Sequence, residues 1–113
     1  MPVTMYHNPR CNTSRKTLRL LRENGVEPTI IEYLKTPYTA AQLKQLLGQL
    51  KMPAIQLVRK KEAAIAGINP AALSEDALIE VMAKNPILVE RPIVVSGRKA
   101  ALGRPPEAVL SVL

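Results

Sequence analysis

The sequence predicts an α/β fold built on a mixed four-stranded sheet, and three patterns in the chain point to it. Residues 3–33 have a strand–helix–strand pattern, residues 39–84 have helical periodicity, and residues 92–113 have the pattern of two strands and a helix. A chain of 113 residues that is 47% hydrophobic can build one core, but it is too short for two ordinary domains. We therefore expect a single domain over residues 1–113.

The first pattern begins with Val3 to Tyr6, a short predicted strand that ends at the polar turn residues after it. A helix is predicted from about Asn12 to the turn at Gly25, because leucines and arginines recur there at helical spacing. Residues Thr29 to Tyr33 favour a second strand, and a right-handed crossover would make the two strands parallel. The leucines predicted to face inward are Leu18, Leu20 and Leu21, and the arginines predicted to face solvent are Arg15, Arg19 and Arg22.

The middle of the chain is predicted to be helical. Thr39 and Gln42 have the spacing of a capping box, and leucines follow at helical intervals. Prolines divide the residues after this helix into shorter segments, the clearest of which runs from about Ser74 to Lys84. The positions predicted to face the core are Leu43, Leu46, Leu47 and Leu50 in the first helix and Leu78, Val81 and Met82 in the second.

The last pattern is a β-hairpin followed by a helix. Residues 92–96 and 98–102 are predicted strands joined by a tight turn at Ser96 and Gly97. The final helix would begin at Pro105 and Pro106 and carry the apolar residues Val109, Leu110 and Leu113. This order of elements predicts a sheet with helices on both faces, which is the plan of thioredoxin-like domains, with the helical middle as an insertion to one side.

The composition restricts the class of protein. No apolar run is long enough to cross a bilayer, and the first residues lack the hydrophobic stretch of a secretory signal, so we expect a cytoplasmic protein with no membrane contact. Cys11 is the only cysteine, which excludes an internal disulfide and a cysteine-rich zinc site. The net charge of +7 suits an anionic partner, but no basic run or tyrosine-rich patch is evident, so we expect no nucleic-acid binding.

Cys11 is the candidate nucleophile. It lies between the first strand and the first helix, where the free N–H groups and dipole of a helix start stabilise a thiolate, the reactive form of cysteine. A lone cysteine is commonly a buried structural residue. Its polar flanks, His-Asn-Pro-Arg before it and Ser-Arg soon after it, favour a reactive thiol instead. His7, Ser14 and Arg15 could each add a hydrogen bond or a positive charge.

A helix start that stabilises a thiolate also suits an oxyanion, and basic side chains would complete such a site. Arg59, Arg91 and Arg104 stand beside predicted ends of structural elements rather than within helices. Considered alone, each of these arginines is most simply interpreted as a solvated surface charge. His7 alone is most simply interpreted as a loop residue that makes an ordinary hydrogen bond. These residue types alone therefore leave the oxyanion site open.

Three segments of the chain match one family. Tyr-His-Asn-Pro-Arg-Cys-Asn-Thr-Ser-Arg at residues 6–15, Glu-Arg-Pro-Ile-Val-Val at 90–95 and Gly-Arg-Pro-Pro-Glu-Ala-Val-Leu at 103–110 resemble the glutaredoxin-coupled, ArsC-like arsenate reductases, in their short chromosomal subgroup. The segments occur in the family's order, and the similarity covers essentially the whole chain. The resemblance implies that the Cys11 thiolate attacks arsenate and that Pro92 is a cis-proline facing it. The residues implied to hold the oxyanion are Arg59, Arg91 and Arg104, and those implied to lower the thiol pKa are His7 and Ser14.

The resemblance also implies the source of electrons. Glutathione, as a co-substrate, would attack the arsenic adduct, and glutaredoxin would reduce the resulting mixed disulfide as arsenite is released. The single cysteine agrees with this, because a chain without a resolving cysteine must take its electrons from another molecule. No bound cofactor, metal, flavin or nicotinamide is required.

Two other functions remain open at this stage. The first is a glutathione-dependent thiol-disulfide reductase, in which Cys11 acts on disulfides and the arginines have no role. The second is a regulator resembling the Spx transcription factors, which share this fold and bind RNA polymerase. Oxidation-sensing regulators of that kind usually carry a Cys-x-x-Cys pair, and here serine stands at the second position of the spacing.

Overall fold

The computed structural model describes residues 2–113 and confirms a mixed four-stranded sheet in that part of the chain. The sheet has the order β2-β1-β3-β4, with β1 parallel to β2 and antiparallel to β3, and with β3 antiparallel to β4. The predicted crossover between parallel strands and the predicted hairpin are therefore both present. The strands are β1 (Val3–His7), β2 (Thr29–Glu32), β3 (Ile93–Ser96) and β4 (Lys99–Leu102).

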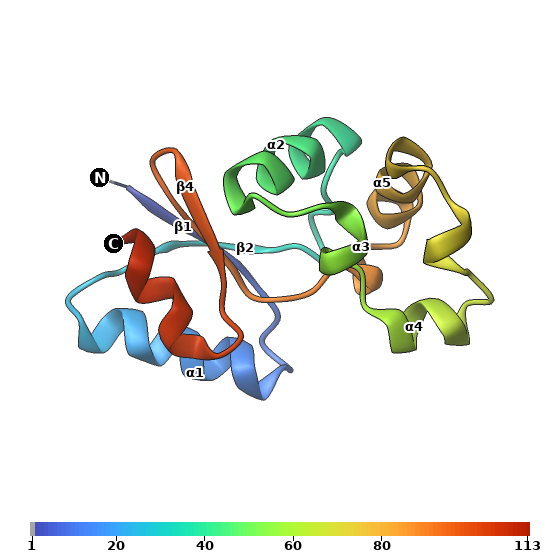
Figure 1. Cartoon of the computed structure of the whole chain (residues 1–113). Helices are drawn as coiled ribbons and strands as arrows, with labels where there is room; N and C mark the ends of the chain where they lie inside the picture. Colours follow the sequence, from blue (N-terminus) through green and yellow to red (C-terminus); the bar gives the residue numbers. More distant parts are fainter. Residues whose placement is uncertain (1) are drawn as a thin grey trace. The chain divides into compact units, whose positions relative to one another are not determined.

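The chain divides into two compact units, and the second is the predicted helical insertion. The first unit comprises the residues up to Thr36 and Arg91–Leu113, and it contains the sheet, α1 (Asn12–Glu23) and the 3₁₀ helix η3 (Pro106–Val112). The second unit is Pro37–Glu90. Its helices, marked in Figure 1, are α2 (Ala40–Leu50), α3 (Ala54–Leu57), α4 (Lys60–Ile65) and α5 (Glu75–Lys84), with 3₁₀ turns η1 (Pro70–Ala72) and η2 (Pro86–Leu88). The single-domain organisation stays a prediction.

The core of the first unit is aliphatic and lies between the sheet and two helices. The buried residues that form it are Val3 and Met5 of β1, Val94 of β3, Leu21 of α1, and Val109 and Val112 of η3. Helices α1 and η3 therefore pack against each other on one face of the sheet, as Figure 1 shows. The expected helices on the second face stay a prediction.

The final helix differs from the prediction in type and in the residues it buries. It is a 3₁₀ helix, and the buried residues are Val109 and Val112, whereas Leu110 and Leu113 are 37% and 48% exposed. The physical reason is the shorter turn, because three residues per turn place positions 109 and 112 on one side.

Two smaller details of the prediction were also wrong. The hairpin turn is formed by Gly97 and Arg98, since Ser96 still pairs with Lys99 and Gly97 has a left-handed φ of 61°. In α5 the buried residues are Leu78, Ile79 and Met82, and Val81 is partly exposed, because α2 and α3 both pack on this helix and shift its buried face.

The cap of the second unit's first helix follows the prediction. The Gln42 backbone N–H donates to the Thr39 hydroxyl at 3.1 Å, and the Thr39 N–H donates to the Gln42 side-chain oxygen at 2.9 Å. This reciprocal pair satisfies two N–H groups that have no partner within the helix. The capping box therefore fixes the start of α2.

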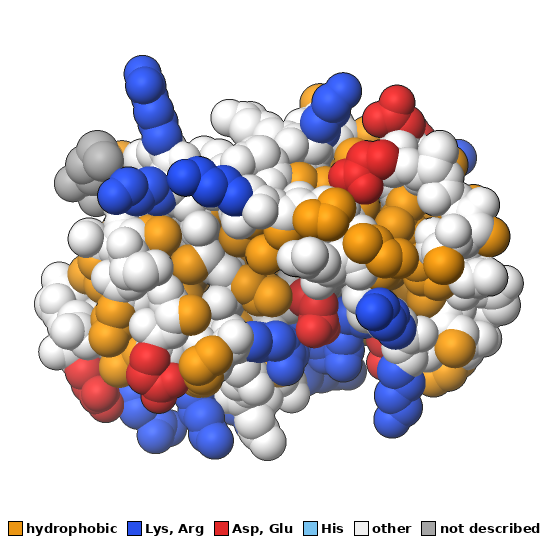
Figure 2. Space-filling view, in the orientation of Figure 1, with side chains coloured by type: hydrophobic (Ala, Val, Ile, Leu, Met, Phe, Trp, Pro, Cys, Tyr) orange, Lys and Arg blue, Asp and Glu red, His pale blue; other side chains and the backbone are white. Residues whose placement is uncertain are grey.

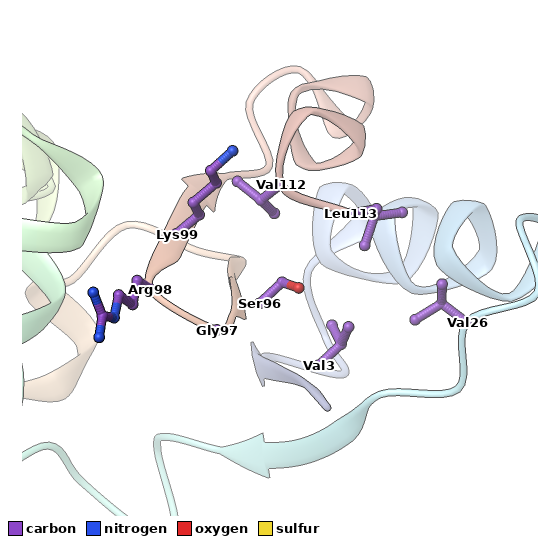
Figure 3. Close-up of a pocket in the computed structure, with 8 residues that line it drawn as sticks. All are labelled: Val3, Val26, Ser96, Gly97, Arg98, Lys99, Val112 and Leu113. Atoms are coloured by element: carbon purple, nitrogen blue, oxygen red, sulfur yellow. The ribbon is translucent and has the colours of Figure 1, made fainter. Parts of the chain in front are cut away.

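A groove of about 710 Å³ opens at the Val3 end of β1. Figure 3 shows apolar side chains on one side of it and the β3–β4 hairpin on the other. The lining residues are Val3, Val26, Ser96, Gly97, Arg98, Lys99, Val112 and Leu113. The groove lies at the opposite end of β1 from His7 and the loop that carries Cys11, and it contains none of the predicted site residues.

Candidate active site

The loop between β1 and α1 holds Cys11 at the N-cap position of the helix. The backbone of Cys11 is extended, with φ −93° and ψ 123°, and its side chain caps no helix N–H. Asn8 shapes the loop, because its carbonyl accepts the Cys11 N–H at 3.0 Å and its side-chain oxygen accepts the Arg10 N–H at 3.0 Å. The turn thus presents the thiol at the start of α1, where unpaired N–H groups point toward it.

The surroundings of Cys11 favour its thiolate. Burial by itself raises the pKa of the Cys11 thiol, but the backbone N–H of Ser14 and the guanidinium of Arg91 lower it by more, so the pKa lies below its usual value. The Thr13 N–H acts in the same direction. The thiol is partly exposed, so the thiolate is accessible to a reactant.

A buried hydrogen-bond network lies behind the thiol. The side chains of His7 and Ser14 are joined by a 2.6 Å hydrogen bond between Nδ1 and Oγ, and the Asn8 N–H donates to the same oxygen at 3.1 Å. Burial lowers the pKa of His7, and the nearby charge of Glu32 only partly offsets this, so the imidazole is neutral at neutral pH. His7 therefore acts on the thiol indirectly. It hydrogen-bonds to the Ser14 side chain, and the Ser14 backbone N–H is directed at the sulfur.

Arg91 and Arg104 both lie beside Cys11. An Arg104 terminal nitrogen is 3.9 Å from the Cys11 sulfur, and Arg104 Nε donates to the Arg91 carbonyl at 2.9 Å. The guanidinium of Arg91 acts on the thiol, yet its Nε and Nη1 are buried and donate to no atom of residues 2–113. Buried N–H groups of this kind normally have a partner, so these two are available to donate to a bound acceptor such as water or an anion.

The cis-proline implied by the resemblance is present. The Arg91–Pro92 peptide bond is cis, and so is Arg104–Pro105, which the sequence did not indicate. Each of the two arginines thus directly precedes a cis-proline.

Sequence reasoning missed Tyr33 and the structural role of Asn8. Tyr33 follows β2 and is fully buried, and burial raises the pKa of its phenol, partly offset by the charge of Arg91 and the side chain of Asn8. Its hydroxyl is thus part of the surroundings of Arg91 and Cys11. The only signal for Tyr33 was its place at the carboxyl end of the strand parallel to β1, and Asn8 was recognised only as a turn residue.

Arg59 belongs to the second unit. It occupies the N-cap position of α4, and its guanidinium contacts Glu90 at 3.0 Å and Glu62 at 3.9 Å. Its side chain is 22% exposed, so these carboxylates hold it in a partly buried ion-pair cluster. The oxyanion contact implied for Arg59 stays a prediction.

Comparisons with known proteins identify the family of the chain. The model of the ArsC family matches residues 6–112. The chain belongs to the ArsC family. It is 54% identical to the uncharacterised protein YfgD of Escherichia coli K12, over 98% of this chain and 96% of that protein. It is 42% identical to the arsenate reductase of the same organism, over 98% of this chain and 80% of that protein. The solved arsenate reductase of Vibrio cholerae has a TM-score of 0.95 and 45% identity, covering 100% of this chain and 98% of that one.

In this ArsC-family protein, five of the six predicted site residues meet around one loop. These are Cys11, His7, Ser14, Arg91 and Arg104. Within residues 2–113 there is no cluster of three or more side chains suited to a metal ion, and no helix is long and apolar enough to span a membrane.

Close packing at Gly103 positions the two arginines of this ArsC-family site. The Gly103 N–H donates to the Pro92 carbonyl at 2.9 Å. A Cβ at Gly103 would lie 2.7 Å from Pro92 Cγ and 2.8 Å from Thr17 Oγ1. The proline ring is rigid, and the Thr17 hydroxyl is itself held by the Thr13 carbonyl at 2.8 Å, so neither can move aside at little cost.

Gly103→Ala is therefore expected to lower the free energy of unfolding by about 1–3 kcal/mol and to lower kcat/KM by displacing Pro92 and Arg91. Gly48→Ala in α2 is the matched control, because nothing lies within 4 Å of its added Cβ and alanine favours a helix by about 0.8–1 kcal/mol. Urea unfolding and steady-state kinetics of both variants measure the effect. Equal free energies of unfolding and equal kcat/KM in the two variants would contradict the packing argument.

Ser14→Ala is expected to lower the free energy of unfolding by about 1–3 kcal/mol, because it leaves the buried His7 nitrogen and the Asn8 N–H without their partner. The Cys11 thiol pKa should rise, since the Ser14 N–H is no longer held in place. Iodoacetamide alkylation across pH and urea unfolding measure the two effects. Ser111→Ala is the control, because its exposed hydroxyl bonds only the Ala108 carbonyl, and it should change stability by less than about 0.5 kcal/mol.

Proposed function

We propose that this protein is an arsenate reductase in which the Cys11 thiolate attacks arsenate. One observation carries the proposal: a thiol with a lowered pKa lies at a helix start beside an arginine whose buried N–H groups have no partner among the described residues. A reactive thiol alone would suit many substrates. The two buried Arg91 nitrogens without a partner among residues 2–113 favour a substrate that carries negative oxygens at the reacting centre.

The arrangement of donors suits a tetrahedral oxyanion. A guanidinium offers several N–H donors in one fixed plane, and these can bind the oxygens of an anion. Arg91 supplies two buried nitrogens without a partner among residues 2–113, Nε and Nη1, on different edges of its guanidinium, and Arg104 supplies a second positive charge near the sulfur. Arsenate supplies both the oxygens and an electrophilic centre, and two proteins with more than 40% identity to this chain carry the name arsenate reductase.

The first chemical step is a displacement at arsenic. The Cys11 sulfur forms a bond to arsenic, one As–O bond breaks, and the oxygen leaves as water after protonation. No electrons have been transferred to arsenic at this point, so the adduct is a thioester of As(V). Arg91 and Arg104 would stabilise the charge on the remaining oxygens, where fixed donors in a partly buried site have their greatest effect.

The second step reduces arsenic. The sulfur of glutathione attacks the Cys11 sulfur of the adduct, the S–As bond breaks, and its electron pair stays on arsenic. As(V) becomes As(III), which leaves as arsenite, and Cys11 becomes a mixed disulfide with glutathione. Glutaredoxin then takes the glutathione by thiol–disulfide exchange and frees the Cys11 thiolate. A second glutathione restores glutaredoxin, so two glutathione molecules become one disulfide per arsenate reduced.

The remaining site residues have positioning roles in this proposal. His7 and Ser14 would hold the start of α1 so that its N–H groups point at the sulfur. The oxyanion contact that the resemblance implies for Arg59 is kept as part of this proposal. A reducing compartment such as the cytoplasm would keep Cys11 as a thiol between turnovers.

Arsenite formation from arsenate tests the proposal. Purified protein is incubated with arsenate, glutathione, glutaredoxin and a glutathione-regenerating reductase, and arsenite is measured directly. Turnover that requires both thiol components is the expected result. The absence of arsenite, together with reduction of a simple glutathione mixed disulfide by the same preparation, would instead establish a thiol-disulfide reductase.

A further inference from the structure

Helix α1 and the residue before Cys11 carry a group of cations that the proposed chemistry does not use. Residues 10–23 contain five basic residues and one acidic residue, Glu23, at the end of the helix. All five side chains are exposed. They are Arg10, Arg15, Lys16, Arg19 and Arg22, and we refer to them as the basic stripe. In the lower left of Figure 2, where Figure 1 places α1, Lys and Arg side chains lie at the edge of the molecule with Asp and Glu side chains beside them.

Most of this charge is not neutralised within the described chain. Only Arg22 pairs with a carboxylate, that of Glu27, with N–O distances of 3.0 to 3.3 Å. Arg15 donates to the Pro9 carbonyl and to the Asn12 side chain, which are both neutral, so it is held in place with its charge intact. Arg10, Lys16 and Arg19 form no ion pair with residues 2–113.

The basic stripe begins at the active-site loop and runs along the exposed side of the helix. At about 100° per residue, Arg15, Arg19 and Arg22 lie within about 60° of one another and extend about 10 Å along the axis. A shallow hollow of about 500 Å³ is lined by these three arginines and by Glu23, and Leu18 provides an apolar surface in it. This surface has charged side chains around a small apolar centre. Protein-docking surfaces commonly have this composition, with a polar rim and an apolar centre.

We infer that the basic stripe is the docking surface for the protein that reduces Cys11, a thiol protein with an acidic face beside its reactive cysteine. The inference rests on the proposed function, because it concerns the step that regenerates the thiol. Cys11 is the only cysteine, so each turnover must end with attack by a thiol from another molecule. A folded protein can bring its thiol to Cys11 only by covering the adjacent surface.

A small thiol does not need such a surface, because it can approach the sulfur without contacting cations a helical turn or more away. A protein that covers this area contacts several of the cations at once, and opposite charges on its face would accelerate association and fix its orientation. In the exchange itself, the partner thiolate attacks the glutathione sulfur of the Cys11 mixed disulfide. The partner–glutathione disulfide forms, and Cys11 leaves as the thiolate.

Charge reversal at the outer part of the basic stripe tests the inference. The protein is first converted to its Cys11–glutathione mixed disulfide, and release of glutathione by an acidic glutaredoxin is then followed. Lys16→Glu/Arg19→Glu should reduce the second-order rate constant at least about tenfold at low ionic strength, and added salt should reduce the difference. Arg98→Glu/Lys99→Glu at the far hairpin changes the net charge equally and should retain the wild-type rate.

Two results would overturn the inference. One is an equal loss of rate in both double variants, because net charge rather than this surface would then be responsible. The other is an equal loss when free glutathione replaces glutaredoxin, because the stripe would then attract any small anionic thiol. The measurement contains no arsenic, so it is independent of arsenate reduction: absent arsenite formation in the wild type would refute the proposed function alone.

Discussion

Replacing Cys11 by serine is expected to lower arsenite formation at least about a thousandfold, which is the scale of loss when a covalent nucleophile is removed. The serine hydroxyl remains protonated under conditions where the surroundings of Cys11 favour a thiolate, so the bond to arsenic does not form. The measurement is arsenite production with saturating glutathione and glutaredoxin.

The same variant should stay folded, which makes the loss interpretable. Cys11 occupies an N-cap position without a side-chain hydrogen bond to the helix, and serine is a favoured residue there. Cys11→Ser is therefore expected to keep or raise the free energy of unfolding, by up to about 1 kcal/mol. Substantial turnover in this variant would exclude Cys11 as the nucleophile, since the chain has no second cysteine to replace it.

Arg91→Ala is expected to lower kcat/KM for arsenate by about 10²–10³-fold, because it removes the buried guanidinium donors from the oxyanion. Arg91→Lys should recover only part of the loss, since an ammonium keeps the charge but does not reproduce the planar set of guanidinium donors. Steady-state kinetics with varied arsenate measure both variants.

The stability of Arg91→Ala should change little while its activity falls. Truncation removes two buried donors, Nε and Nη1, that have no partner among residues 2–113, and it also removes the hydrogen bonds of the guanidinium to Cys11 and Tyr33. These effects oppose each other, so the free energy of unfolding is expected to change by less than about 1 kcal/mol. Arsenate or sulfate should raise the Tm of the wild type by preferential binding to the folded state, and this increase should disappear in Arg91→Ala. A Tm increase of equal size in both would contradict the assignment of the oxyanion site.

Arg91 also affects the pH below which Cys11 becomes protonated and loses reactivity. Burial raises the pKa of the Cys11 thiol, and the Ser14 N–H and Arg91 lower it by more. Because the thiolate is the deprotonated form, the alkylation rate of Cys11 should increase as pH rises through a midpoint below that of an ordinary cysteine. Without Arg91 the thiol pKa is higher, so this midpoint should shift to higher pH. Iodoacetamide alkylation of the wild type and Arg91→Ala compares the two midpoints.

Local patterns were sufficient for most of the secondary structure. Three patterns each depend only on residues close in the sequence. They are the weak alternation of Val, Thr and Tyr before the turn at Asn8, the helical spacing of leucines and arginines in α1, and the Thr39–Gln42 capping box. These patterns also determine the order of elements, and the right-handed crossover rule then limits the sheet to few topologies. The fold class could therefore be predicted without any knowledge of long-range contacts.

Details that depend on packing could not be predicted in this way. The 3₁₀ form of η3 buries Val112 instead of Leu113, and the contacts of α2 and α3 bury Ile79 instead of Val81. In both cases the buried and the exposed residue are apolar and lie close together in the sequence. Hydrophobicity alone therefore does not predict which of the two is buried.

The sequence by itself determined the candidate nucleophile, because the polar flanks of Cys11 before a predicted helix favour a reactive thiol over a buried structural cysteine. Only the tertiary structure decided which other groups surround it. Arg91 and Arg104 follow Cys11 by some 80 and more residues, and the pairing of β3 with β1 brings their strand ends back to the loop. Whether the Arg91 donors have a hydrogen-bond partner, and whether the Tyr33 hydroxyl lies near Arg91, likewise depends on the folded structure. Hydrogen-bond satisfaction and burial are properties of the packed chain, and no spacing of residues along the sequence encodes them directly.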